Sequence, residues 1–212
     1  MGCARLDRPW LDFDLGAEMP VLSWSVNRPG LVRARRILWR EVRNRDLPPD
    51  LDVADWFAAE LAAREAGDAV GFLTSRNVAC YTESRASVQG ITADVVASIG
   101  LSNAERIGRR MDYAARDWGT INIAVRVSAG LTEAARIEAL SIAVEARTAA
   151  VMEAGFRLPH GIATGTGTDC MAIAAPAGDT AYTGLHTAVG EAIGKAVYNA
   201  VRQGATAWMT NR

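Results

Sequence analysis

The sequence predicts an α+β or mixed α/β protein, a single domain in which two long helices pack on a mixed β-sheet. Two alanine-rich segments, residues 132–154 and 186–203, carry apolar residues at helical spacing. Residues 119–127 alternate between the two faces of a strand, with isoleucine and valine on one of them. Helices that follow clustered strands are typical of a sheet covered by helices. Short apolar segments predict further strands at residues 69–74, 90–101 and 162–175.

Composition limits the classes of protein to consider. The 212 residues suit one domain, 1–212, and with 50% hydrophobic and 22% charged residues they can form a substantial core. A net charge of −1 gives no electrostatic footprint for nucleic acid or for an anionic membrane. The first residues lack the apolar segment of a signal peptide, and no apolar run approaches the roughly 20 residues of a spanning helix. The expected location is the cytoplasm.

The three cysteines, Cys3, Cys80 and Cys170, lie far apart in the sequence. They show neither zinc-ligand spacing nor a disulfide framework, so we expect reduced, partly buried side chains. Only Cys170 is close to suspected chemistry, next to Asp169. A nucleophilic cysteine needs a base and an electropositive setting, and the sequence indicates neither.

The N-terminal part shows turn signals between short elements. Strands are expected at residues 21–26 and 31–42, on either side of the turn signal 27–30. A helix is expected over residues 52–66, with Asp52 as its cap and Gly67 as its end. Irregular or connecting segments are expected at residues 75–89, a polar loop, and 106–118, a charged surface connection.

Two polar residues stand out on the predicted strand and helix that follow. Asn122 projects from the strand 119–127 opposite the face that carries isoleucine and valine, where its ordinary role is a hydrogen bond within the sheet. The helix 132–154 begins at the cap Thr132 and ends before Gly155. Glu145 lies among small and apolar neighbours on this helix. It is therefore either functional or paired with an arginine such as Arg147.

The final helix, predicted over residues 186–203, places His186 in its first turn. Unpaired backbone amides and the helix dipole disfavour an imidazolium there, and a neutral imidazole is what a general base requires. A capping or core histidine is the alternative. Gly190 and Gly194 in the same helix would let another backbone come close.

The segment 160–175 combines hydroxyls, glycines and an acid. Three threonines alternate with two glycines and precede Asp169, so in an extended chain the hydroxyls would share one face. This pattern fits a wall of hydroxyls and backbone amides that faces a substrate. It also fits a flexible glycine loop before a core strand. The residues concerned are Thr164, Gly165, Thr166, Gly167, Thr168 and Asp169.

Several motifs together resemble the adenosylcobinamide amidohydrolases, enzymes of corrinoid salvage. The resemblance is strongest over residues 69–202 and weaker over residues 1–50. Arg147, where the family more often has lysine, and Leu185, at a variable position, are departures that leave the resemblance intact. The motifs, in chain order, are Gly100-Leu101-Ser102-Asn103-Ala104, Gly119-Thr120-Ile121-Asn122-Ile123, Glu145-Ala146-Arg147-Thr148-Ala149-Ala150, Ala163-Thr164-Gly165-Thr166-Gly167-Thr168-Asp169 and Gly184-Leu185-His186-Thr187-Ala188-Val189-Gly190-Glu191.

The resemblance implies hydrolysis of the amide between the aminopropanol arm and the corrin ring of adenosylcobinamide, giving adenosylcobyric acid for cobalamin biosynthesis. Some members also act on complete cobamides. The corrinoid is then the substrate, and no cofactor is expected.

Residue types and motif placement suggest the catalytic roles. Asp169 or Glu145 would activate water, and His186 would carry the proton. Asn122 and the glycine amides would stabilise the oxyanion. In a variant of this scheme, a threonine of the 164–168 string is the nucleophile and His186 its base. The expected substrate-binding and oxyanion residues are Asn103, Asn122, Thr164, Gly165, Thr166, Gly167 and Thr168.

Alternatives remain at this point. His186, Asp169 and Glu145 could ligate a metal, although a metal-independent site is favoured because these residues lie on three separate elements. One alternative to an enzyme is a protein that binds and delivers corrinoids without catalysis. Another is a self-processed hydrolase with an N-terminal threonine nucleophile. A homodimer is plausible.

Overall fold

The computed structural model describes residues 3–111 and 119–211 and contains a mixed sheet of eight strands, so the predicted α+β class is confirmed. The strand order is β4-β3-β2-β12-β8-β6-β5, and β1 pairs with β2 outside this path. The pairs β3/β4 and β12/β8 are parallel and the others antiparallel. The strands of the sheet are β1 (Cys3–Asp7), β2 (Trp10–Ser23), β3 (Gly30–Glu41), β4 (Val70–Thr74), β5 (Thr82–Val88), β6 (Ile91–Ile99), β8 (Ile121–Val127) and β12 (Cys170–Ala174).

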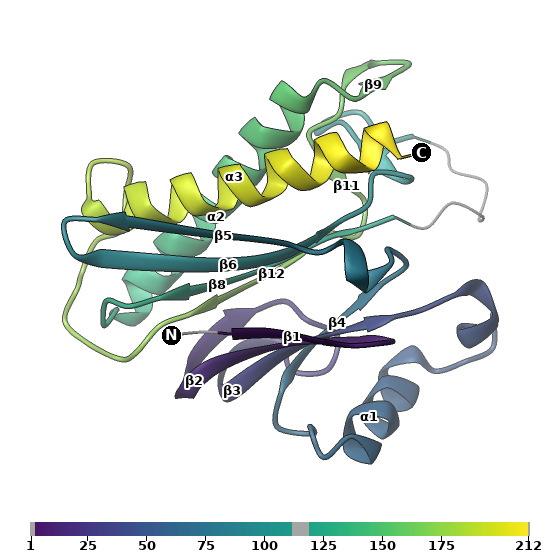
Figure 1. Cartoon of the computed structure of the whole chain (residues 1–212), viewed down its shortest axis with the longest axis horizontal. Coiled ribbons are helices and arrows are strands. Elements are labelled where there is room, and N and C mark those ends of the chain that lie inside the picture. The colour runs from purple at the N-terminus through teal and green to yellow at the C-terminus, as the bar shows by residue number, and fades with distance from the viewer. Residues whose placement is uncertain (1–2, 112–118, 212) are drawn as a thin grey trace.

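The sheet folds back on itself and forms the two middle layers of a four-layer structure (Figure 1). Helices α2 (Glu133–Ala154) and α3 (Ala188–Thr210) cover the half made of β5, β6, β8 and β12, as expected for the two long helices. Helix α1 (Val53–Ala63) covers the outer face of the half made of β1 to β4. The two halves share one buried cluster, which joins large side chains of β2, β3 and β4 to Val96, Ala124 and Ala172.

The predicted strand 119–127 is buried on both faces, and the shared cluster explains why. Residues 121–125 of β8 are all buried, because one face packs under α2 and α3 and the other packs against the N-terminal half of the sheet. Asn122 therefore lies in the interior between the two halves and is only 1% exposed. A strand buried on both faces still shows polar alternation when one of the buried faces holds hydrogen-bonded groups.

Two strand predictions are corrected by the structure. The predicted strand 21–26 is the end of the longer strand β2, which begins at Trp10. The predicted loop 75–89 contains the edge strand β5. Only Thr82 and Ala86 of this strand are buried, so it lacks the apolar alternation by which strands are recognised. The charged connection 106–118 lies partly outside the described residues.

The helix predictions are largely confirmed. Asp52 caps α1 by accepting hydrogen bonds from the next turn, but the helix ends at Ala63, before a left-handed Glu65 rather than at Gly67. Helix α2 begins after the cap Thr132 and ends before a left-handed Gly155. Helix α3 begins after the cap Thr187 and runs to Thr210. In the described ranges, no helix is long and apolar enough to cross a bilayer.

Short strands lie above one end of the sheet, beside α2. β7 (Ala104–Glu105) pairs with β11 (Gly165–Thr166), and β9 (Arg157–Leu158) pairs with β10 (Gly161–Ile162). Gly100-Ala104 and the threonine-glycine segment therefore meet, although they are distant in the sequence. This meeting point is the candidate site.

Candidate functional site

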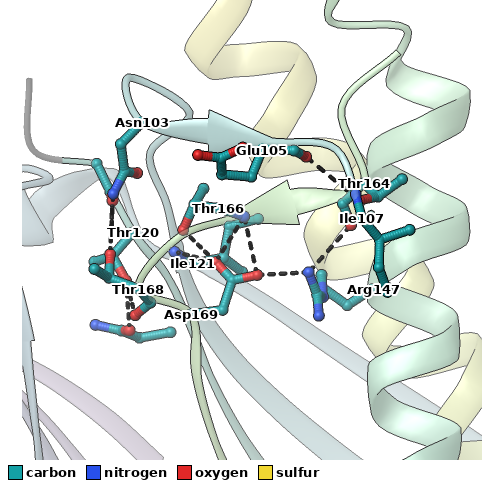
Figure 2. A network of polar contacts seen from close by, with 12 residues as sticks. Asn103, Glu105, Ile107, Thr120, Ile121, Arg147, Thr164, Thr166, Thr168 and Asp169 are labelled. Carbon is teal, nitrogen blue, oxygen red and sulfur yellow. Dashed lines mark hydrogen bonds and ion pairs between the residues drawn. The ribbon is translucent and has the colours of Figure 1, made fainter. Parts of the chain in front are cut away.

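Asp169 is the centre of the polar network at this end of the sheet (Figure 2). It lies immediately before β12, and its carboxylate accepts hydrogen bonds from Thr166 N at 3.1 Å and Ile121 N at 3.2 Å. Thr166 Oγ1 also donates to it, and Arg147 Nη1 forms an ion pair at 2.5 Å. The side chain is 7% exposed. Asp169 thus holds strands β8, β11 and β12 and helix α2 together.

Burial raises the pKa of the Asp169 carboxyl above its ordinary value, while the Arg147 charge and the Thr166 hydrogen bonds act in the opposite direction. Four groups donate to the carboxylate, and this arrangement suits its ionised form. A carboxylate with raised proton affinity beside a hydroxyl has the properties of a general base. The site therefore offers a proton acceptor in an almost water-free position.

Gly165 is required where Arg147 reaches Asp169. Arg147 extends from α2 and also donates to Thr164 O at 3.1 Å. A Cβ atom at Gly165 would overlap the Arg147 guanidinium and lie 2.7 Å from Asp169 Oδ2. The glycine thus permits the buried ion pair, which is the close approach that a glycine in a strand often marks.

The threonine hydroxyls bind groups of the chain itself instead of forming the expected row toward a substrate. Thr164 Oγ1 accepts from Ile107 N at 2.8 Å, and Thr166 Oγ1 donates to Asp169. Thr168 Oγ1 donates to Gly119 O at 3.0 Å. Of the three, the Thr166 hydroxyl is the one whose proton is directed at a base.

Asn103 lies beside Thr168 in the same network. Its Nδ2 donates to Thr168 Oγ1 at 3.2 Å, and its backbone oxygen accepts from Gly167 N at 3.3 Å. Asn103 Oδ1 is buried and has no hydrogen-bond partner among residues 3–111 and 119–211. Gly167 and Thr168 are exposed, so this side of the network faces solvent.

Asn122 joins the two halves of the sheet. Its Nδ2 donates to Leu73 O of β4 at 2.7 Å, and its Oδ1 lies 3.0 Å from the hydroxyl of Thr120. The Thr120 hydroxyl is also 2.8 Å from Thr168 O. The side chain thus makes hydrogen bonds of the kind that its ordinary structural role requires, at the edge of the Asp169 network.

Glu145 and His186 do not join this network. Glu145 is exposed and accepts from Ser141 Oγ at 3.2 Å, and residues two apart on a helix face different ways, so it points away from the Arg147 side. Of the two alternatives for Glu145, pairing with Arg147 is not observed, because Arg147 pairs with Asp169. His186 precedes α3 and is exposed, which corrects its predicted position in the first turn.

The loop that carries His186 packs near the beginning of α2 rather than near Arg147. Thr183 N donates to Glu138 Oε2 at 2.5 Å. Glu138 and Arg147 are nine positions apart on α2, which corresponds to about 13 Å along a helix. Within the described ranges, no three histidine, cysteine or acidic side chains form a group that could hold a metal ion. The metal-independent site favoured from the sequence stays a prediction.

Comparison with known proteins decides the family. The family model described as adenosylcobinamide amidohydrolase matches residues 4–212, well beyond the segment in which the motifs were recognised. The chain belongs to this family. An uncharacterized protein of Methanocaldococcus jannaschii is 41% identical over 87 residues, which are 39% of this chain and 34% of that protein. The chain therefore spans about a third of the length of this curated relative.

A structural comparison adds a distant similarity. The crystal structure of the PH0078 protein from Pyrococcus horikoshii is similar with a TM-score of 0.46 and 9% identity, over 92% of this chain and 76% of that one. A similarity at this level supports no inference about the chemistry of this amidohydrolase family member.

Arg147 and Trp24 are residues of the site that were not predicted as functional. Arg147 was treated as a family variation and as a possible partner of Glu145, whereas in the structure it is the cation that pairs with the buried Asp169 carboxylate. Trp24 is 44% exposed, and its Nε1 donates to the backbone oxygen of Asp169 at 2.7 Å. No local signal points to Trp24, because it reaches Asp169 through the pairing of β2 with β12.

Cys170 should react slowly with thiol reagents. Burial raises the pKa of its thiol to about 12, so almost no thiolate exists near neutral pH. Cys3 and Cys80 are exposed and should react first with iodoacetamide. Peptide mass spectrometry over a time course measures each rate, and alkylation of Cys170 in the folded protein as fast as that of Cys80 would contradict the expectation.

Proposed function

We propose that this protein hydrolyses the amide between the aminopropanol arm and the corrin ring of adenosylcobinamide, releasing aminopropanol and adenosylcobyric acid. The observation that carries the proposal is the family match over residues 4–212. A buried carboxylate that receives a hydroxyl hydrogen bond supports an acyl-transfer reaction of this kind. A corrinoid carrier, by contrast, requires no such pair.

In this proposal Asp169 is the proton acceptor and Thr166 the nucleophile. The Thr166 oxygen attacks the amide carbonyl while its proton passes to Asp169 Oδ1, with which it is already hydrogen-bonded. Asp169 returns the proton to the departing amine, and water then cleaves the resulting ester. Arg147 holds the carboxylate in position and keeps it ionised before the reaction.

Oxyanion stabilisation requires donors that are free to face the substrate. Asn122 and Gly167 N, both expected in this role, donate within the chain to Leu73 O and Asn103 O. The Gly167 bond is the longer of the two, at 3.3 Å, and lies on the exposed side of the network. We therefore assign the oxyanion to the Gly167 amide, which would exchange its bond to Asn103 O for the substrate oxygen, and keep Asn122 as a link between the sheet halves.

Mass spectrometry of adenosylcobinamide incubated with the purified protein tests the function. Equimolar adenosylcobyric acid and aminopropanol are expected, and their formation should fall at least about a hundredfold in Asp169→Asn, the size of a general-base contribution. Asp50→Asn is the matched control, because Asp50 is an exposed acid away from the site. Tight binding without a change in substrate mass would instead support the carrier.

Variants of Thr166 and His186 test whether Asp169 or His186 is the base that activates the nucleophile. Thr166→Val should abolish turnover and Thr166→Ser should retain part of it, because only serine keeps a hydroxyl beside Asp169. His186→Gln should retain most of the activity, since His186 is exposed and Thr183 of its loop contacts Glu138, near the beginning of α2. Initial rates measure all three variants. A large loss in His186→Gln would restore this histidine as the base, and full activity in Thr166→Val would assign attack to water.

A further inference from the structure

A concave site lies on the N-terminal half of the molecule, apart from the Asp169 network. It is a pocket of about 410 Å³ lined by seven residues from the β1–β2 turn, the end of β3 and the segment that follows. This volume is within the usual range for small-molecule sites. The lining residues are Arg8, Pro9, Arg40, Glu41, Arg43, Arg45 and Asp46.

The pocket carries excess positive charge. Four arginines face two acids, a formal charge of +2, and one positive charge remains if Glu60, which accepts from Arg40 Nε at 2.8 Å, is counted with them. Arg8 and Arg43 share a single buried carboxylate, that of Glu41. The excess positive charge is therefore distributed over guanidinium groups, whose five N–H donors are not all used by the acids of the pocket.

Glu41 fixes the geometry of this arginine cluster. Its carboxylate is 5% exposed and accepts from Arg8, Arg43 and Val78 N, the last at 3.0 Å. The buried acid therefore holds two guanidinium groups in place at the pocket while being fully occupied itself. Two positioned guanidinium groups are suited to a tetrahedral oxyanion, to which arginine donates two hydrogen bonds at once.

Arg45 is the least neutralised member of the cluster. Its side chain is 88% exposed, and its Nε lies 3.8 Å from Asp46 Oδ1, at the outer limit of an ion pair. Asp46 is already occupied, because its Oδ2 accepts from Arg43 N at 2.8 Å. Arg45 thus has the freedom to close over a bound anion.

We propose that this pocket binds a phosphate group, either free or as the ester of a small molecule. The proposal is independent of the reaction assigned to Asp169. The pocket and the candidate site lie toward the same end of the sheet, because Glu41 pairs with Thr74, the Thr74 hydroxyl contacts Ser98 at 3.5 Å, and Ser98 pairs with Asn122. A phosphate held here thus lies toward the same end of the sheet as the candidate site and outside its network.

Isothermal titration with inorganic phosphate and with glycerol 3-phosphate, at ionic strength matched with potassium chloride, tests the proposal. Binding of either probe is expected, and the tighter one shows whether the pocket prefers the free anion or an ester. Arg45→Gln should weaken binding about tenfold or more, the usual effect of losing one charge-assisted hydrogen bond. This variant leaves every contact of Glu41 in place, so it should melt like the parent when no phosphate is present.

Arg33→Gln is the matched control. Arg33 is an exposed arginine of β3 that pairs with Glu18 outside the pocket, and its loss should change phosphate affinity less than about twofold. Two results would overturn the proposal. One is that neither probe binds the parent protein at millimolar concentration, and the other is that Arg33→Gln loses as much affinity as Arg45→Gln.

Discussion

Asp169→Asn should lower the free energy of unfolding by about 3–5 kcal/mol, because it leaves the Arg147 cation without its partner in a buried position. The Arg147 side chain is only 13% exposed, so water cannot replace the carboxylate. Asparagine keeps an oxygen that can accept from Thr166 N and Ile121 N, which confines the change mainly to charge. Urea denaturation measures the loss.

Adding Arg147→Met to Asp169→Asn should recover much of that stability. Removing both charges of a buried pair is far less costly than removing one, since no uncompensated ion remains. Turnover in the proposed reaction should stay as low in the double variant as in Asp169→Asn, because the proton acceptor is still missing. A double variant as unstable as the sum of the single ones would show that the two side chains are not coupled.

The free energy of unfolding of Arg147→Met alone should depend on pH differently from that of the parent protein. Burial already places the pKa of folded Asp169 above 3.8, so the contribution of this group to stability is greatest below that pH and is lost as pH rises through the folded pKa. Removing Arg147 raises the folded pKa further. The stability deficit of this variant should therefore grow from acid toward neutral pH.

Gly190→Ala should destabilise the protein by about 3 kcal/mol, whereas Gly194→Ala, one turn further along α3, should stabilise it by about 0.5–1 kcal/mol. A methyl group at Gly190 would overlap the backbone oxygens of Thr183 and Gly184. At Gly194 the nearest atom to such a methyl group is Ile142 Cγ2, 3.9 Å away. Only the helix preference for alanine acts there.

Thermal and urea denaturation of the two alanine variants provide the comparison. Because both replacements are glycine to alanine on the same helix, their intrinsic helix propensities cancel in the difference. Similar stability in the two variants would mean that the loop 183–184 moves freely away from α3. The sequence predicted a close backbone approach at both glycines, and the structure shows it only at Gly190.

Sequence signals such as helix caps predicted the elements whose ends depend on neighbouring residues in the chain. Thr132 and Gly155 bound α2 because a cap and a left-handed residue act within one turn of the helix. The edge strand β5 was missed because its polar residues face solvent, so its strand structure depends on pairing with β6. The full burial of β8 depends on a half of the sheet that is distant in sequence.

The candidate site was predicted in part for the same reason. The threonine-glycine segment and Asp169 are contiguous, so their joint role was visible in the sequence. The partner of Asp169 lies 22 positions earlier, on a helix, and only the packing of α2 beside β11 brings it there. His186 was included because it was expected in the first turn of a helix, but the contact of Thr183 with Glu138 keeps its loop elsewhere.

The course of β2 limits how the two halves of the sheet can move. This one strand pairs with β3 along most of its length and, through Val21, Leu22 and Ser23, also with β12. The Asn122 bond to Leu73 O is a second link between the halves. Separating the halves would break the hydrogen bonds between β2 and β12, so these strands hold the two halves together. In the proposed reaction, the substrate would therefore meet the two halves of the sheet as one rigid base.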